Sequence, residues 1–387
     1  MNRLRRLCVI CVLFLGIFML SGCASSNEID NRAIVQVVGL DLEDGVFTAS
    51  LEYFTPMGSG DQPINLSENN SEIVIGHGLT ISEAIENAAL PKGKTPFYAQ
   101  SSVIIIGREL AENSMDVVAD YINHDIDLRV DTEIYVADEK ASDLVNKEVD
   151  RGVLPGEAIE RLHEIYYNNG LMLRTEYYEF ANYYYSDFQA VGLPLVAAVQ
   201  IETNQADSSG ESQTSNSPKL RIGYIGTEII KDKKACGSLD FIQTRGVLWL
   251  TDQIPTTSID TVTQSGTPVS LDVVSSETIV RPVYKEGKVT FEIEINNLLN
   301  IREYQTMDLN ATNADEYKEL CDLVTEVIRK ECESAWNQAV NEYGADVFGY
   351  GYRLRSAYPE LTDWISENWN EQVKNADIQI QIHNQLE

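Results

Sequence analysis

Cysteine is scarce in this chain, and its placement excludes one class of protein. The 387 residues contain six cysteines, and Cys8 and Cys11 lie in an apolar N-terminal segment that is expected to be removed. A third, Cys23, stands at the expected cleavage point. The three that remain cannot all pair internally, so the body is not a disulfide-stapled scaffold.

Catalytic and metal-binding motifs are also missing. None of the four histidines forms an H-E-x-x-H or H-x-x-x-H pattern, and no G-x-S-x-G sequence exists. Gly76-His77-Gly78 before an expected helix lacks the further glycine and the Gly-Lys-Ser/Thr of a phosphate loop. Asp41, Glu43 and Asp44 could bind calcium, but the rest of a calcium loop is absent, so a plain turn is favoured. We predict no catalytic residue, no metal ligand and no enzymatic activity, and no ligand-binding residue is identified.

Positive charge is the third shortage. The chain has 29 Lys and Arg against 60 Asp and Glu, a formal net charge of −31, and losing the leader's three arginines would leave −34. So acidic a body is repelled by nucleic acid and by anionic lipid headgroups. We therefore expect no nucleic-acid partner.

The chain has one long apolar run, at residues 7–20, and it follows a basic cluster. A spanning helix needs about 20 apolar residues, so this run is typical of a signal peptide over residues 1–22. Its end, Leu20-Ser21-Gly22-Cys23, resembles the lipobox of bacterial lipoproteins, which implies a diacylglyceryl lipid on Cys23 and no other cofactor. The alternative is an uncleaved N-terminal anchor. Residues 23–30 would then be a lipidated tether that holds the body on the outer face of a membrane.

The N-terminal α/β region is predicted over residues 31–203. Strands at 33–42 and 46–53 flank Asp44-Gly45, a hairpin signal. A strand at 72–75 and a turn at 76–78 precede a helix that begins with the capping box Thr80 and Glu83. A buried strand at 102–107, a helix at 109–123 and a strand at 132–137 follow.

Two helices expected at 157–167 and 175–188 are rich in tyrosine. Their seven tyrosines could form a stacking platform for a sugar or peptide, half-buried helix packing with hydroxyl groups at the rim, or a partner interface. The sequence alone leaves these three open. The residues concerned are Tyr166, Tyr167, Tyr177, Tyr178, Tyr183, Tyr184 and Tyr185.

Residues 204–217 are almost entirely small, polar or acidic, which predicts an exposed polar linker or loop. The C-terminal α/β region, 218–387, is predicted to contain strands at 222–230, 246–251, 269–273 and 279–284, and to split near 270–285 into a middle and a final domain. Alternation over 289–295 and 378–382 predicts half-buried strands. Between them, apolar spacing predicts a long helix over 315–343 that Gly344 ends.

The expected fold is mixed α/β (α+β), with several compact strand–helix domains in a row. Its C-terminal domain should combine an antiparallel sheet with the long helix. This class follows from strands and helices in both regions, with alternating strands concentrated toward the end of the chain.

Several segments resemble the Ger(x)C family, the lipoprotein C subunits of spore germinant receptors. In the N-terminal half they are Val38-Gly39-Leu40-Asp41, Gly78-Leu79-Thr80 and Val103-Ile104-Ile105-Ile106-Gly107; in the C-terminal half, Asp346-Val347-Phe348-Gly349-Tyr350-Gly351. The resemblance implies three compact α/β domains and a complex with two integral-membrane subunits, of A and B type. It also implies a location at the spore inner membrane and a role in the response to nutrients.

The leading interpretation is a lipid-anchored receptor subunit that acts by protein–protein interaction. The alternative is a solute-binding lipoprotein of a membrane transporter, which predicts regular strand–helix alternation and a ligand cleft between two lobes. A cell-wall enzyme is a third possibility, which should carry a catalytic cluster. The strands expected after Leu220 and the missing motifs argue against these two.

Overall fold

The computed structural model describes residues 32–54, 71–93, 95–98, 101, 103–124, 128–146, 155–186, 190–201, 219–304 and 314–387. The predicted signal peptide, the tether with Cys23 and the polar segment 204–217 lie outside these ranges.

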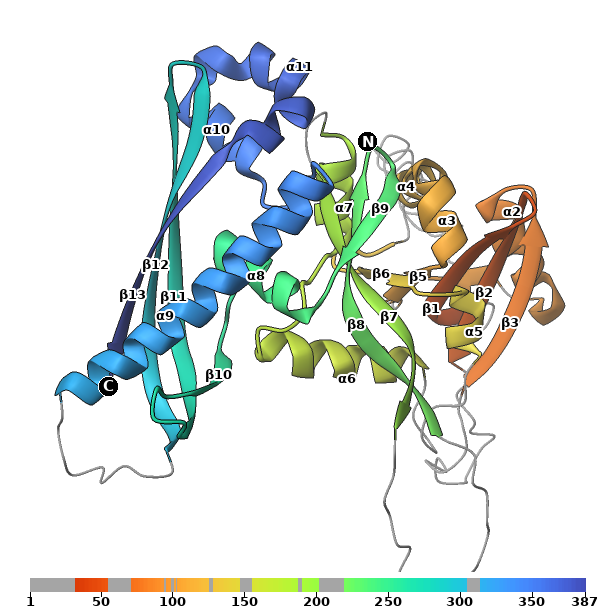
Figure 1. The fold of residues 1–387 in the computed structure, drawn as a ribbon. Helices are drawn as coiled ribbons and strands as arrows, with labels where there is room; N and C mark the ends of the chain where they lie inside the picture. The colour runs from red at the N-terminus through yellow and green to blue at the C-terminus, as the bar shows by residue number, and fades with distance from the viewer. Residues whose placement is uncertain are drawn as a thin grey trace, which may run out of the picture.

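The first part of the described chain forms a nine-stranded mixed sheet in the order β3-β2-β1-β5-β6-β7-β8-β9, with β4 beside β1 (Figure 1). Strands β1, β4, β5, β6 and β7 are parallel, and the strands at the two ends run antiparallel to their neighbours. The strands are β1 (Arg32–Glu43), β2 (Val46–Phe54), β3 (Ser71–Gly78), β4 (Thr95–Phe97), β5 (Val103–Ile106), β6 (Glu133–Ala137), β7 (Val191–Ile201), β8 (Lys219–Lys231) and β9 (Lys234–Leu239).

Helices cover both faces of this sheet, which is why its parallel strands are continuous apolar runs. Apolar residues of α2, α3, α4 and α7 share a core on one face, and those of α5 and α6 share a core on the other. The predicted helix over 109–123 is divided at Ser114 into two helices. The helices are α2 (Ile81–Ala89), the 3-10 turn η2 (Leu90–Lys92), α3 (Arg108–Asn113), α4 (Met115–His124), α5 (Ala141–Val145), α6 (Pro155–Asn168) and α7 (Tyr177–Tyr184).

The turn signals of this half gave one correct and one wrong prediction. Asp44 and Gly45 both have positive φ, as a tight hairpin turn requires, and join β1 to β2. The turn predicted at Gly76–Gly78 is instead the end of β3. A Cβ atom on Gly76 would lie 2.2 Å from the backbone oxygen of Ala84, so glycine is needed there because α2 approaches the strand closely.

The strands on either side of the polar segment 204–217 pair with each other. β7 and β8 are antiparallel neighbours from Val191–Ile230 to Ile201–Lys219. The segment therefore connects two adjacent strands of one sheet, and the two regions predicted on either side of it share that sheet.

The second sheet has four strands in the order β10-β11-β12-β13. The predicted antiparallel arrangement holds for β10, β11 and β12, but β13 runs parallel to β12. The reason is that the chain returns from the end of β12 through helices before it enters β13. The strands are β10 (Thr257–Val262), β11 (Pro268–Lys285), β12 (Lys288–Tyr304) and β13 (Asp377–Leu386).

The split considered near 270–285 falls inside a strand. β11 is continuous from Pro268 to Lys285 and pairs with β12 over that length. A domain boundary inside this strand would cut its pairing with β12, and the described residues form two sheets.

The strand predicted at 246–251 is wrong: these residues belong to helix α8 (Phe241–Thr251). Asp240 caps the helix, because its carboxylate accepts a hydrogen bond from the Gln243 backbone N–H at 2.8 Å. The Asp240 backbone N–H in turn donates to the side-chain oxygen of Gln243. Val247, Leu248, Trp249 and Leu250 are all buried. A helix that is apolar on every side has no 3.6-residue pattern, so a short apolar run of this kind resembles a buried strand.

Figure 1 shows the long helix α9 (Ala314–Trp336) lying diagonally across the four-stranded sheet. A π-helical segment, η3 (Asn337–Glu342), continues it, and Gly344 with φ +64° ends it as predicted. Helices α10 (Tyr350–Ala357) and α11 (Thr362–Gln372), with the short turns η4 (Pro359–Leu361) and η5 (Val373–Asn375), complete this unit. Among the helices that the structure describes, none is long and apolar enough to cross a membrane.

Candidate functional site

The one site residue predicted from the sequence, Cys23, lies outside the described residues, so its lipidation stays a prediction. The described chain offers a different feature, a groove between the two sheets. It has a volume of about 330 Å³ and receives side chains from α7, from the end of α8 and from the start of α10.

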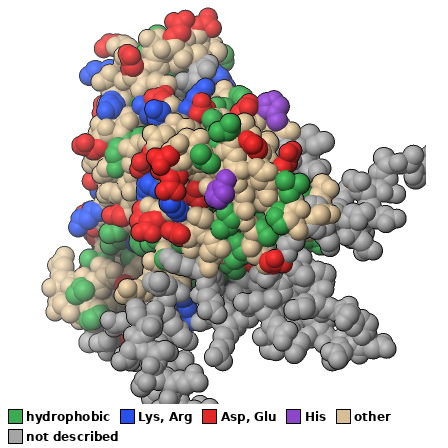
Figure 2. All heavy atoms as spheres, turned by 90° about the vertical axis from the view of Figure 1, so that its right-hand side faces the viewer, with side chains coloured by type: hydrophobic (Ala, Val, Ile, Leu, Met, Phe, Trp, Pro, Cys, Tyr) green, Lys and Arg blue, Asp and Glu red, His purple; other side chains and the backbone are tan. Residues whose placement is uncertain are grey.

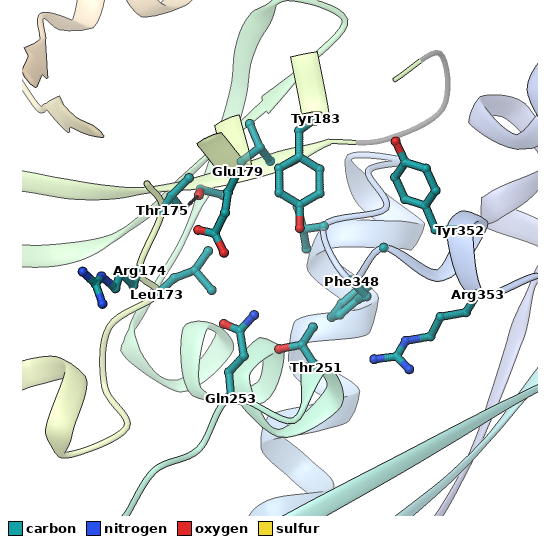
Figure 3. A pocket seen from close by; sticks show the side chains of 14 residues that line it. Leu173, Arg174, Thr175, Glu179, Tyr183, Thr251, Gln253, Phe348, Tyr352 and Arg353 are labelled. Carbon is teal, nitrogen blue, oxygen red and sulfur yellow. Dashed lines mark hydrogen bonds between the residues drawn. The ribbon is translucent and has the colours of Figure 1, made fainter. Parts of the chain in front are cut away.

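Three polar side chains from two segments converge in the groove (Figure 3). Glu179 and Tyr183 lie one turn apart on α7, and Gln253 follows α8; all three point into the space between them. Phe348, just before α10, forms an apolar part of the wall.

The α7 side of the groove is held in place by local hydrogen bonds. Thr175 Oγ1 donates to the Gly192 carbonyl at 2.6 Å and so fixes the chain before α7 to β7. The Glu176 N–H donates to Glu179 Oε2 at 3.1 Å, which completes a capping box at the start of the helix. Glu179 therefore has a structural bond at one oxygen while its carboxylate faces the cavity.

Burial shifts the ionisation of both acidic groups in the groove. It raises the pKa of the Glu179 carboxyl, and the neighbouring Glu176 charge raises it further against the opposing backbone hydrogen bond and Arg174. Burial also raises the pKa of the Tyr183 hydroxyl to about 12, with Glu179 as the next cause that raises it. The groove thus presents a carboxylate and a neutral phenol in partly desolvated surroundings.

Two arginines flank the groove, and within the part of the chain that the structure describes one of them is paired. Arg174 binds Glu176 at 2.6 Å and Glu133 at 3.3 Å, and Figure 3 shows its side chain turned away from the cavity. Arg353 on α10 is exposed and makes no ion pair within the described part of the chain. The groove can therefore offer hydrogen bonds and charge of both signs to a polar group.

The α10 side is organised by the buried carboxylate of Asp346. Its two oxygens accept the backbone N–H groups of Tyr350 at 3.0 Å and Gly351 at 2.6 Å, and the indole N–H of Trp369 at 2.8 Å. One side chain thus fixes the start of α10 and ties α11 to it. Tyr350 in turn donates its hydroxyl to the Leu250 carbonyl at 2.9 Å, which connects α10 to α8.

The seven tyrosines do not form one platform, because α6 and α7 lie on opposite faces of the nine-stranded sheet. On α6, Tyr166 packs edge-on against Tyr224 with ring centroids 5.4 Å apart, which is packing within the body. Tyr178 on α7 and Tyr185 just after it are 56% and 59% exposed, and Tyr183 lines the groove. The tyrosines of α7 and its end are therefore accessible to a partner or ligand.

The groove's lining residues include no Ser–His, Cys–His or paired-carboxylate arrangement. Among the described residues no group of three or more His, Cys, Asp or Glu could hold a metal ion. What the groove can do chemically is bind polar groups. The sequence indicated Tyr183 through its tyrosine-rich helix, but it gave no signal for Gln253 or Arg353, which reach the groove only through the tertiary fold.

The fold defines a mixed α/β protein of two sheets with a polar groove between its units. Comparison with known protein families identifies the family to which the chain belongs. Residues 25–198 match the spore germination protein N-terminal domain, and residues 225–387 match the spore germination B3/GerAC-like C-terminal domain. The two matches together cover most of the sequence, so the chain belongs to the Ger(x)C family of spore germination proteins, as its resemblance to that family predicted.

Similar proteins span nearly the whole chain. Spore germination protein B3 of Bacillus subtilis is 22% identical, over 96% of this chain and 95% of its own. Spore germination protein A3 of the same organism is 24% identical, over 98% of this chain and 96% of its own. The crystal structure of the GerBC protein shares the fold, with a TM-score of 0.57 at 18% identity over 90% of this chain and 96% of that one.

Proposed function

We propose that this chain is the lipid-anchored C subunit of a nutrient germinant receptor and acts in spore germination by protein–protein interaction. The observation that carries the proposal is that both halves match spore germination domains while the relatives align over their full length. Its partners are two integral-membrane subunits, of A and B type.

The anchor fixes where the body works. A diacylglyceryl group on Cys23 would hold the chain on the outer face of the spore inner membrane, and two acyl chains bind far more firmly than one. Arg32, where β1 begins, is nine residues after Cys23. Because extended residues span at most about 3.5 Å each, β1 begins within about 30 Å of the lipid. The body therefore meets its partners close to the bilayer.

Binding rather than catalysis is the proposed activity. The groove of Figure 3 offers hydrogen-bonding and charged groups without a nucleophile beside a base. The acidic body is repelled by anionic lipid, so a protein partner rather than the lipid surface should orient it.

The complex is tested by isolating the tagged protein from spore membranes in mild detergent. Two multi-spanning subunits should copurify with it, and deletion of its gene should slow germination with one class of nutrient. Recovery of the lipoprotein alone, together with normal germination of the deletion strain, would reject the receptor interpretation and favour the solute-binding alternative.

The anchor is tested by Cys23→Ala in the producing host. Because the thioether forms on the Cys23 sulfur, the variant should take up no labelled palmitate and should accumulate as a larger precursor. Cys236→Ala is the matched control, since Cys236 is an exposed free cysteine in the body. Labelling of Cys23→Ala at the level of the control would show that the lipid is elsewhere.

A further inference from the structure

A second hollow lies between helices α2 and α4 of the nine-stranded unit, on the part of the molecule that Figure 1 shows at the right and Figure 2 turns toward the viewer. It is open to solvent and has a volume of about 510 Å³. Its lining residues come from the first turn of α2 and from one side of α4: Thr80, Ile81, Ser82, Val117, Asp120, Tyr121 and His124. It is separate from the groove between the two sheets, whose lining shares none of these residues.

The floor and border of this hollow are apolar. Ile81 is 2% exposed and closes the floor, while Val117 is 37% exposed on the α4 side. Leu79, immediately before α2, is 76% exposed, although its backbone N–H is fixed by a 2.7 Å hydrogen bond to Glu83. Exposed apolar side chains therefore border the hollow on both sides, Leu79 before α2 and Val117 on α4.

The two helices that border the hollow are acidic. Asp120 lines it, Glu83, Glu86 and Asp116 lie elsewhere on α2 and α4, and neither helix contains Lys or Arg. Figure 2 shows hydrophobic side chains reaching the surface on this face with few Lys or Arg among them. Two basic side chains lie near Asp120: His124 is 3.3 Å from it and mostly exposed, and Lys233 lines a neighbouring hollow together with it.

We propose that the α2–α4 hollow is a docking surface for a cationic amphipathic helix of a protein partner. The apolar side of such a helix would cover Leu79, Val117 and the Ile81 floor, and its flanking Lys or Arg side chains would lie near the four carboxylates of α2 and α4. A helix in an apolar groove with charges at the border is a recurring mode of recognition. The inference rests on the proposed function in one respect: the helix is assigned to one of the membrane subunits.

Charge complementarity distinguishes this occupant from others. An acidic or neutral helix would leave four exposed carboxylates facing like charge or none, and a second copy of this chain would bring the same acidic helices together. A cationic helix gains both the apolar contact and the attraction. Its association should therefore be weakened by salt.

The experiment places a photo-crosslinking amino acid at position 79 or 117 of the full-length lipoprotein in spore membranes. Position 262 is the control, because Val262 is 53% exposed on the other sheet. After irradiation the crosslinked peptides are identified by mass spectrometry. Positions 79 and 117 should both join one segment of a membrane subunit, with apolar residues at helical spacing and at least two Lys or Arg beside them.

Three outcomes test the docking surface and its assignment to the membrane subunits. Crosslinking at 79 and 117 no stronger than at 262, while the membrane subunits still copurify, overturns the docking surface and leaves the proposed function standing. Crosslinks to an acidic or non-amphipathic segment also overturn it. Crosslinks to a cationic amphipathic segment of some other protein support the surface and contradict its assignment to the receptor subunits.

Variants supply the second measurement. Leu79→Ser should reduce copurification of the partner by about tenfold, the loss expected for one anchor residue at an interface, and Val262→Ser should not reduce it. Asp116→Asn with Asp120→Asn should lessen the effect of salt on the complex. Since Leu79 and both aspartates are exposed, the thermal midpoint should be unchanged in every variant. Normal copurification of Leu79→Ser would count against the surface.

Discussion

Single buried carboxylates hold this molecule together at several points. Asp41, which the sequence placed in a plain turn or a calcium loop, accepts the backbone N–H groups of Ala141 and Ser142 at 2.7 and 2.9 Å and so fixes the start of α5. Glu331 on α9 accepts the Trp249 indole N–H at 2.8 Å and pairs with Arg245 of α8. Sequence reasoning missed both roles because each partner lies more than 80 residues away.

Asp346 is the sharpest case, since three donors converge on its two oxygens. In Asp346→Asn one oxygen becomes an NH₂ group, so at least one buried donor loses its acceptor. We expect a loss of about 1 to 3 kcal/mol in the free energy of unfolding at pH 7. Urea unfolding of residues 24–387 measures this, with Asp363→Asn on the exposed side of α11 as control. Equal midpoints for the two variants would contradict the role assigned to Asp346.

The same pair of variants predicts a pH dependence. Burial is the largest influence on Asp346 and raises its pKa above the ordinary 3.8, against the hydrogen bonds from the backbone of Gly351 and Tyr350 and from the Trp369 indole. The folded state therefore holds this proton more tightly than the unfolded state. The carboxyl's contribution to stability falls as the pH rises from about 3.8 through the raised pKa. Asp346→Asn should lack this fall, so the stability of the variant relative to the wild type should increase as the pH rises across that window.

At the scale of elements, half-buried segments and the buried strand β5 were predictable, but a fully buried helix was not. Apolar residues alternate with polar ones along β12 and recur at three- and four-residue steps along α9. Both patterns arise because each element has one buried face and one solvent-exposed face. Helix α8 is buried on nearly all sides, so its sequence lacks a helical alternation of apolar and polar residues. For this reason the sequence predicted a strand there. The end of β3 was assigned to a turn because its glycines serve close packing rather than a bend.

The candidate site was predictable only in part, for a related reason. The tyrosines of α7 stand out in the sequence by composition. The residues opposite them, Gln253 and Arg353, are ordinary surface types whose meaning comes from the packing of α8 and α10 against α7. No local pattern encodes a contact of that kind.

The crossing of α8 and α9 offers a test at this scale. A Cβ atom at Gly246 would lie 2.1 Å from the Glu331 carbonyl oxygen and 2.6 Å from Ala335 Cβ. Gly246→Ala should gain up to about 1 kcal/mol in helix propensity but lose about 1 to 3 kcal/mol by overpacking. The steric effect should win because the clash is with backbone. Urea unfolding should show net destabilisation, and Ile242→Ala, at a 55% exposed position of the same helix, should be nearly neutral.

At the scale of the whole molecule, one hydrophobic cluster includes residues of both sheets. Ile229 of β8 and Leu239 of β9 belong to the nine-stranded sheet, yet they cluster with α8, α9 and the inner face of the four-stranded sheet. The match to the N-terminal family domain ends at residue 198, within β7, and the match to the C-terminal domain begins at residue 225, within β8. The hydrogen-bonded pairing of those two strands crosses that division.

A cut in the chain tests which division is physical. A specific protease site inserted between residues 202 and 218 leaves every described strand intact. After cleavage the two pieces should elute together on gel filtration, because eleven residues of β7 remain paired with β8, which also pairs with β9. They should separate only in denaturant, whereas two independent domains would separate in native buffer. The uncut protein with the same insertion is the control, and two native peaks after cleavage would show that the shared sheet does not hold the halves together.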